Sequence, residues 1–305
     1  MKLKLKIALL SLFSSTCYRP SFSQTEEPTP PHITDKNVRG FHTGIYIGSL
    51  FANKSSASFY DGYGYDTSGI KNTFAKSFMY RRIIIDYGGG AGQTDQVAQA
   101  LGVSPGDWTF DETDMPINMK YNPAITAGVH LMYSFNKNNS ILLNASVSKL
   151  TASGNFTIVL NTNPIGAQQP NYQNIQTFSI TGSEQRSNFQ LGFQRIFGKE
   201  DGVNCFLEGG AELTLAKYIR NQATINNLHI DLSAFYSIPY YSTYRARYLS
   251  GLGLGAFAGF GMNYFVNAKC RLQLLYDPSY EKINIGTAPK LKLQHSAGLR
   301  IYYHL

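Results

Sequence analysis

Residues 229–233, HIDLS, place His229, Asp231 and Ser233 at alternate positions. Hydrolysis or acyl transfer by a serine requires a base that activates the hydroxyl, so these residue types suggest a barrel hydrolase or acyltransferase. Alternate residues on one face of a strand lie about 6–7 Å apart, too far for a direct hydrogen bond between base and nucleophile. The sequence therefore predicts no catalytic residue, and a lipid-modifying or proteolytic enzyme is kept only as an alternative.

A second segment that could do chemistry is GDWTFDETD, with Asp107, Asp111, Glu112 and Asp114. Clustered carboxylates are calcium ligands, but the spacing is not that of an EF-hand loop. A solvated acidic loop is the simpler interpretation. No metal site and no cofactor is predicted, and the sequence shows no phosphate-binding glycine loop or zinc-ligand spacing.

The composition indicates the kind of element that must carry these segments. Of the 305 residues, 43% are hydrophobic, 13% aromatic and only 15% charged, against roughly 25% charged in an ordinary soluble domain. The mature chain has no apolar run long enough for a spanning helix. Few charges and many aromatic residues suit a membrane β-barrel, and a soluble β-sandwich is the alternative.

The N-terminus predicts export. MKLKLK is basic, IALLSLF is apolar, and Ser21 and Ser23 precede Gln24, so residues 1–23 are predicted to be a secretory signal peptide. Cys17 raises the alternative of a lipoprotein, but the residues before it make a poor lipobox. Cleavage removes four basic residues and lowers the net charge from +8 to +4, so the charge does not indicate a nucleic-acid partner. The proline-rich residues 24–39 are predicted to be a periplasmic tether.

From Gly40 to Leu305 the chain alternates apolar and polar residues in eight segments. They are residues 40–51, 123–135, 140–150, 187–197, 204–219, 250–266, 268–277 and 291–305. The connections alternate between short turns and long loops, at about 53–122, 151–186, 220–249 and 278–290. This asymmetry predicts a closed antiparallel barrel of eight strands, with both termini in the periplasm and the long loops extracellular. Ten strands is the alternative, because the first loop contains KSFMYRRIIIDY, which could be a strand.

The last segment carries the pattern by which the chain resembles a known family. Ser296, Gly298, Ile301 and Tyr303 match the C-terminal signal that the barrel-assembly machinery reads. With eight strands, residues 40–305 resemble the small OmpA/OmpX-type outer-membrane barrels. This resemblance implies the outer membrane of a Gram-negative bacterium, with outer-membrane lipid, lipopolysaccharide and the barrel-assembly machinery as partners. The His-x-Ser of lipid A deacylases of this fold is not matched, because Ala297 follows the outward-facing His295 at the serine position.

The inward face of the predicted strands is charged, and an eight-stranded barrel is just wide enough for side chains to fill it. The predicted lumen network consists of His42, His130, Glu208, Glu212, Lys269, Arg271, Asp277, Lys292, Arg300 and His304. We interpret it as a structural plug of ion pairs, and a narrow proton or ion path is the alternative. Aromatic residues at strand ends are predicted to form an interfacial girdle, namely Phe51, Tyr133, Phe135, Phe197, Tyr264, Tyr276 and Tyr303. The two mature cysteines, Cys205 and Cys270, are expected to be small apolar residues, with a single disulfide as the alternative.

The first loop is too long for a mere connection. Within it, QTDQVAQALG (93–102) is predicted to be a helix that ends at Gly102. In the second loop, FTIVL and IQTFSI are predicted to continue barrel strands beyond the membrane. Together these features predict a non-enzymatic barrel with a structural or partner-binding role, such as a surface adhesin or an accessory subunit of a larger secretion or uptake complex.

Overall fold

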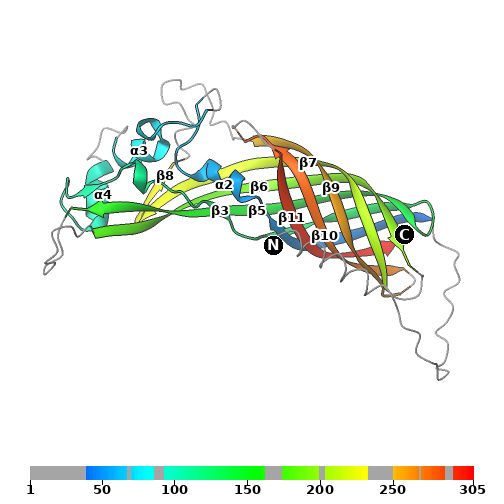
Figure 1. Ribbon diagram of the computed structural model, residues 1–305. Helices are drawn as coiled ribbons and strands as arrows, with labels where there is room; N and C mark the ends of the chain where they lie inside the picture. The colour runs from blue at the N-terminus through cyan, green and yellow to red at the C-terminus, as the bar shows by residue number, and fades with distance from the viewer. Residues whose placement is uncertain are drawn as a thin grey trace, which may run out of the picture.

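In the computed structural model, eight antiparallel strands close into a ring. The structure describes residues 39–66, 70–85, 93–161, 174–198, 203–232, 250–267, 269–285 and 291–305. The ring consists of β1 (Gly40–Phe51), β4 (Ala124–Ser134), β5 (Asn139–Leu160), β6 (Asn174–Phe197), β7 (Val203–Ile225), β9 (Ser250–Phe265), β10 (Cys270–Ile283) and β11 (Lys292–His304), with β11 pairing back to β1 (Figure 1). The prediction of eight strands is confirmed, and the signal peptide 1–23 and nearly all of the tether 24–39 lie outside the described residues.

The closing pair explains why the C-terminal strand alternates so strictly. Ile45 on β1 faces Ile301 on β11 and Val129 on β4, so β1 is hydrogen-bonded on both sides. The Leu305 amide also donates to the Phe41 carbonyl at 3.0 Å. A sheet closed in this way leaves no free edge and satisfies the backbone groups internally, as a lipid environment requires.

The two faces of the ring differ sharply in polarity. Outward side chains are apolar and exposed, for example Ile45 and Leu254, which are 63% and 62% exposed. Inward side chains include buried charges such as Glu208 and Arg300. An apolar exterior around a polar interior identifies a closed antiparallel transmembrane β-barrel of the outer-membrane type. Among the described helices, none is long and apolar enough to cross a membrane.

The two ends of the barrel are unequal. Connections β4–β5, β6–β7 and β9–β10 span only a few residues, and β1 begins and β11 ends at this short-turn end. At the opposite, long-loop end, β5, β6 and β7 continue well beyond the ring and carry β2 (Trp108–Thr109), β3 (Lys120–Tyr121) and β8 (Leu228–Asp231) as added partners. Figure 1 shows these extended strands leaving the barrel, with α3 and α4 beside their far ends.

The polarity pattern inverts where these strands leave the membrane. Within the barrel, β5 points Ser146 and Ser148 inward and the apolar Val147 outward. Beyond Lys149, the same inward face carries Phe156 and Ile158, both buried, and the outward face carries Asn155 and Thr157. A side chain that faces lipid must be apolar, whereas one that faces water is polar. The inversion therefore marks the membrane boundary on β5.

A β-bulge keeps the apolar face continuous on β7. Tyr218 pairs with Glu184 and Arg220 pairs with Ser183, so Ile219 is an extra residue. Before the bulge the even-numbered Tyr218 is buried, and after it the odd-numbered Ala223 is buried. One inserted residue shifts the alternation by one position. The bulge thus turns the apolar side chains of the extension onto the face that the first loop covers.

The first loop folds as short helices against this face. They are α2 (Lys54–Ala57), η1 (Ser58–Tyr60), η2 (Phe74–Lys76), α3 (Phe78–Ile83), α4 (Gln93–Leu101) and η3 (Glu112–Asp114). Helix α4 confirms the helix predicted at 93–102, and Gly102 follows it with a φ of 73°. The possible strand in KSFMYRRIIIDY is instead α3, because the Ser77 hydroxyl accepts the Tyr80 amide at 3.0 Å and starts a helix.

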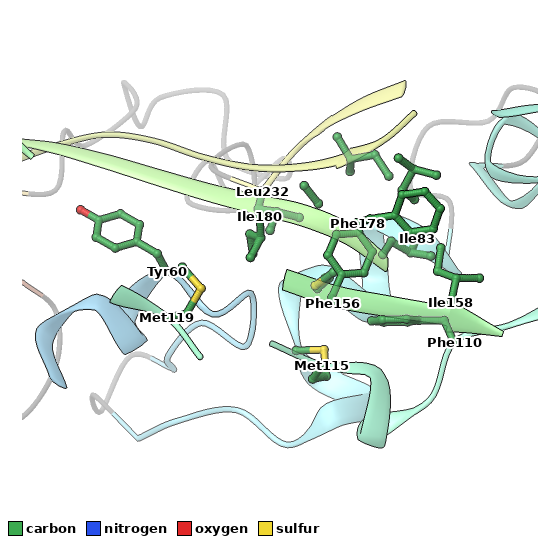
Figure 2. Close-up of a cluster of buried hydrophobic side chains, with 14 of the residues drawn as sticks. Tyr60, Ile83, Phe110, Met115, Met119, Phe156, Ile158, Phe178, Ile180 and Leu232 are labelled. Atoms are coloured by element: carbon green, nitrogen blue, oxygen red, sulfur yellow. The ribbon is translucent and has the colours of Figure 1, made fainter. Parts of the chain in front are cut away.

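The helices and the extended sheet enclose the largest hydrophobic core of the described residues. Phe110, Met115 and Ile83 from the loop pack with Phe156 and Phe178 from the sheet (Figure 2). We call this unit, made of residues 52–123 with the extended ends of β5, β6 and β7 and with β8, the extramembrane domain. Its separate core shows that the long-loop end is a folded domain.

Two predicted loops are therefore wrong in extent. Residues 151–186 were expected to be a loop but are largely β5 and β6, which confirms that FTIVL and IQTFSI continue barrel strands. Residues 220–249 include the end of β7 and all of β8. A membrane needs only about 9–11 residues per strand, and these strands continue well past that length. Likewise β10 runs to Ile283, beyond the predicted start of the last loop.

Candidate functional site

The centre of the lumen is a clamp between Arg300 and Glu208. The two guanidinium Nη atoms donate to the two Glu208 oxygens at 3.0 Å each. Gln194 donates to Glu208 at 2.8 Å, and Arg300 also donates to Gln273 at 2.8 Å. Gly259 makes room for the clamp, because a Cβ there would lie 2.8 Å from Glu208 Cγ. A bidentate pair with additional hydrogen bonds is the geometry that a buried ion pair needs.

Histidines and a tyrosine fill the short-turn end. His42 is stacked on His304, with ring centroids 4.6 Å apart, and lies edge-on to Tyr302 at 5.6 Å. His130 Nδ1 lies 2.6 Å from Asn144 Oδ1, and the Tyr302 hydroxyl donates to Asn263 at 3.1 Å. His42, His130 and Tyr302 are almost fully buried, so rings rather than open water occupy this end.

A second cluster closes the long-loop end of the lumen. Arg186 Nε lies 2.6 Å from Glu184 Oε1, and Arg186 Nη1 lies 3.7 Å from Glu281 Oε1. Thr214 donates to Glu281 at 2.5 Å. We call Glu184, Arg186, Thr214 and Glu281 the mouth cluster. All four side chains are buried, because the extramembrane domain lies over them.

The extramembrane domain reaches into this cluster through Tyr60. Its hydroxyl donates to Glu184 Oε2 at 2.7 Å, and its ring is stacked on Tyr218 with centroids 5.8 Å apart. Gly182 has no side chain where the Tyr60 ring lies, and any Cβ there would overlap that ring. Burial raises the pKa of the Tyr60 phenol well above its ordinary value, so the hydroxyl stays protonated as a donor. Tyr60 thus joins the first loop to the lumen network.

An ion pair between a buried aspartate and an exposed lysine also orders the start of the first loop. Lys71 Nζ lies 2.7 Å from Asp61 Oδ2, and the Lys71 ammonium is 4.1 Å from the Tyr63 ring centroid. Burial raises the pKa of the Asp61 carboxyl, while Lys71 and the Tyr63 amide oppose the rise. Gly62 and Gly64, at φ values of 82° and 72°, let the chain turn tightly here.

The structure places most of the predicted lumen residues on the inward face. His42, His130, Glu208, Glu212, Asp277 and Arg300 are buried, whereas Arg271, Lys292 and His304 are half-buried near the two ends. The placement of Lys269 in the lumen is wrong. It is exposed in the β9–β10 turn, because β10 begins at Cys270, two residues after the predicted start of this segment.

Sequence reasoning missed Glu184, Arg186 and Glu281. Each falls inside a segment that was assigned to a loop, although each continues the alternation of its strand. Glu281 is two positions after Ser279 and four after Asp277 on the inward face of β10. Continued alternation past the membrane boundary was the signal that could have found them.

The predicted girdle residues lie on the outward face, with one placed at a different height. Phe51, Phe135, Phe197, Tyr264 and Tyr303 are exposed, and Tyr133 is partly exposed beside Phe41 and Phe135. Tyr276 is not at a strand end. It lies midway along β10, where its hydroxyl is 2.5 Å from His295 Nδ1 on β11, so its position in the girdle is wrong.

The four residues of the predicted assembly signal all lie on β11. Ser296 and Gly298 pair with Leu50 and Gly48 of β1, while Ile301 and Tyr303 point outward and are exposed. Cys205 and Cys270 are not joined by a disulfide bond; they lie on β7 and β10, beside Met262 and Tyr303 respectively.

The two segments that suggested chemistry both lie in the extramembrane domain. His229 on β8 has its Nδ1 3.2 Å from the Thr224 hydroxyl, and Ser233 lies outside the described residues. Asp111 and Asp114 cap η3 reciprocally, and Thr157 donates to Asp114. Within the described ranges, no group of three or more His, Cys, Asp and Glu side chains is arranged to hold a metal ion.

Comparison with known proteins gives only distant structural likenesses. No family model and no curated protein sequence matches the chain. It is similar to the crystal structure of Neisserial surface protein A, with 10% identity, a TM-score of 0.37, and coverage of 87% of this chain and 97% of that one. It is also similar to the outer membrane protein OprG from Pseudomonas aeruginosa, with 8% identity, a TM-score of 0.36, and coverage of 88% of this chain and 98% of that one. For the translocator domain of the autotransporter NalP from Neisseria meningitidis, the identity is 12% and the TM-score 0.25, with coverage of 100% of this chain and 96% of that one. None of these likenesses assigns a function or a site residue to this chain.

Proposed function

We propose that this protein is a non-enzymatic outer-membrane barrel that anchors a folded extramembrane domain at the cell surface, where the domain binds a partner. The observation that carries the proposal is the core shared by the first loop and the extended strands. Phe156, Phe178 and Phe110 are buried in it far beyond the membrane boundary. A barrel that only needed closed connections would not require such a core.

The lumen supports an anchoring role and disfavours the narrow channel. Arg300, Glu208, His42, His130 and Tyr302 are almost fully buried along the barrel axis. Rigid scaffolds that present variable surface regions are the usual arrangement for binding proteins. We propose that the partner is a component of a larger membrane-protein complex or a surface ligand, and that both chain termini lie in the periplasm.

The test is purification from native membranes in mild detergent, with tagged wild-type protein and tagged Phe156→Ala. We expect wild type to retain a partner in a fixed ratio, and Phe156→Ala, which retains the barrel but loses the domain core, to release it. Asn155→Ala, which changes an exposed neighbour on the same strand, should behave as wild type. Recovery of wild type as a lone monomer, or equal retention by Phe156→Ala, would contradict partner binding by the domain.

A further inference from the structure

A small cavity of about 30 Å³ lies inside the barrel between the Arg300–Glu208 clamp and the mouth cluster. Its wall includes Asn188, Glu212, Asp277 and Ser279, with Tyr46 and Arg300 beside them. One water needs roughly 10–15 Å³ of such space. The cavity therefore has room for a single ion with one water, or for about two waters.

Three oxygen atoms of residues that line this cavity have no hydrogen-bond partner. Glu212 Oε2, Asp277 Oδ1 and Asn188 Oδ1 are all buried and unpaired among the described residues. The other oxygen of each carboxylate is occupied, since Asn188 donates to Glu212 at 2.8 Å and Gln190 donates to Asp277 at 2.7 Å. Glu212 is 3% exposed and Asp277 is 7% exposed. Leaving such acceptors unmet in a buried site is costly.

The two buried arginines nearby, of which Arg300 lines the cavity, form their ion pairs with other carboxylates. Arg300 is paired with Glu208, and Arg186 is paired with Glu184 and lies 3.7 Å from Glu281. Within the described part of the chain, neither Glu212 nor Asp277 has an ion pair with a basic side chain. Two buried carboxylates that form no ion pair of their own favour a bound cation.

From this geometry we infer that the cavity binds one divalent cation of the calcium class. Carboxylate, amide and hydroxyl oxygens are hard ligands that suit Ca²⁺, and its two charges match Glu212 and Asp277. Mg²⁺ keeps several waters in a rigid octahedron, for which about 30 Å³ is too small. Zn²⁺ prefers nitrogen and sulfur ligands, and no histidine or cysteine lines the cavity. Bound in this way, the ion would join β7 to β10, which lie on either side of β9 in the ring.

Calorimetric titration of the folded, chelator-treated full-length protein in detergent with Ca²⁺ tests the inference. We expect one ion per chain, at least about tenfold weaker binding of Mg²⁺, and loss of the site in Glu212→Gln/Asp277→Asn. Asp111→Asn/Glu112→Gln removes the same charge from exposed positions in the extramembrane domain and should leave Ca²⁺ binding unchanged.

Gel mobility before and after boiling shows whether each variant has folded. If the double variant does not fold, the single variants Glu212→Gln and Asp277→Asn are titrated with Ca²⁺ in its place. Calcium should also raise the unfolding temperature of wild type and not that of the lumen variants. The inference is overturned if folded wild type binds no Ca²⁺, if Mg²⁺ binds equally well, or if the lumen variants bind Ca²⁺ as wild type does.

Discussion

Phe156→Ala is expected to unfold much of the extramembrane domain and to leave the barrel intact. Phe156 is 1% exposed, and its ring lies 6.1 Å from Phe110 and 5.8 Å from Phe178 between ring centroids. Removing a buried phenylalanine ring typically costs about 3–5 kcal/mol. Because a whole domain is stabilised by only about 5–15 kcal/mol, this single change removes a large part of the domain's stability.

The barrel should survive because Phe156 lies beyond the membrane boundary on β5. Limited proteolysis should cut Phe156→Ala within residues 52–123 much faster than wild type. The boiling-dependent gel shift, which reports the closed ring, should be unchanged. Asn155→Ala provides the matched control on the opposite face of the same strand. Equal protection of Phe156→Ala and wild type would show that the domain does not depend on this core.

Arg300→Met is expected to produce the largest loss of stability within the barrel. The substitution leaves Glu208, which is 6% exposed, without the guanidinium that contacts both of its oxygens. Removing one partner of a buried ion pair typically costs about 3–5 kcal/mol, because the remaining charge is uncompensated. Unfolding in urea, followed by loss of the compact gel band, measures the change in the free energy of unfolding.

The double variant Arg300→Met/Glu208→Gln separates the charge effect from lost packing. Removing both charges should recover most of the loss, since the penalty comes from the charge left alone. The coupling energy, obtained from wild type, Arg300→Met, Glu208→Gln and the double variant, then gives the strength of the pair. A double variant that is as unstable as Arg300→Met would show that packing of the arginine stem, rather than charge, holds the barrel here.

The sequence was sufficient to predict the ring because the membrane imposes a strict pattern. Every outward residue from Ile125 to Tyr133 on β4 faces lipid and had to be apolar or small. The same alternation fixed the inward position of Arg300 and the outward position of Leu299. Register followed from the faces, since a shift by one residue would expose charges to lipid.

The extramembrane domain was beyond the reach of this reasoning. On β5, Asn155 and Thr157 face outward where a barrel strand would carry apolar residues, so the membrane pattern ended although FTIVL was predicted to continue the strand. The bulge at Ile219 then shifted the alternation of β7 and hid its continuation. The β-branched residues Ile83, Ile84 and Ile85 made a strand possible where the structure has helix α3. Burial of Phe78, Met79 and Ile83 in the domain core stabilises the helix.

The contact of Tyr60 with the lumen could not be predicted from local patterns. Tyr60 and Glu184 are 124 residues apart in the chain and meet only because the first loop folds back over the barrel. Long-range pairings of this kind depend on tertiary packing. The two most informative residues for the closure of the lumen, Tyr60 and Arg186, therefore emerged only from the structure.

Single-channel recording in planar bilayers tests whether the barrel is a filled anchor or an open channel. Folded wild-type protein, checked by its gel shift before insertion, should show no discrete conductance steps at any applied voltage, because Arg300, Glu208 and the mouth cluster occupy the lumen. Reproducible unitary conductance from the folded wild type would contradict the account and establish a channel.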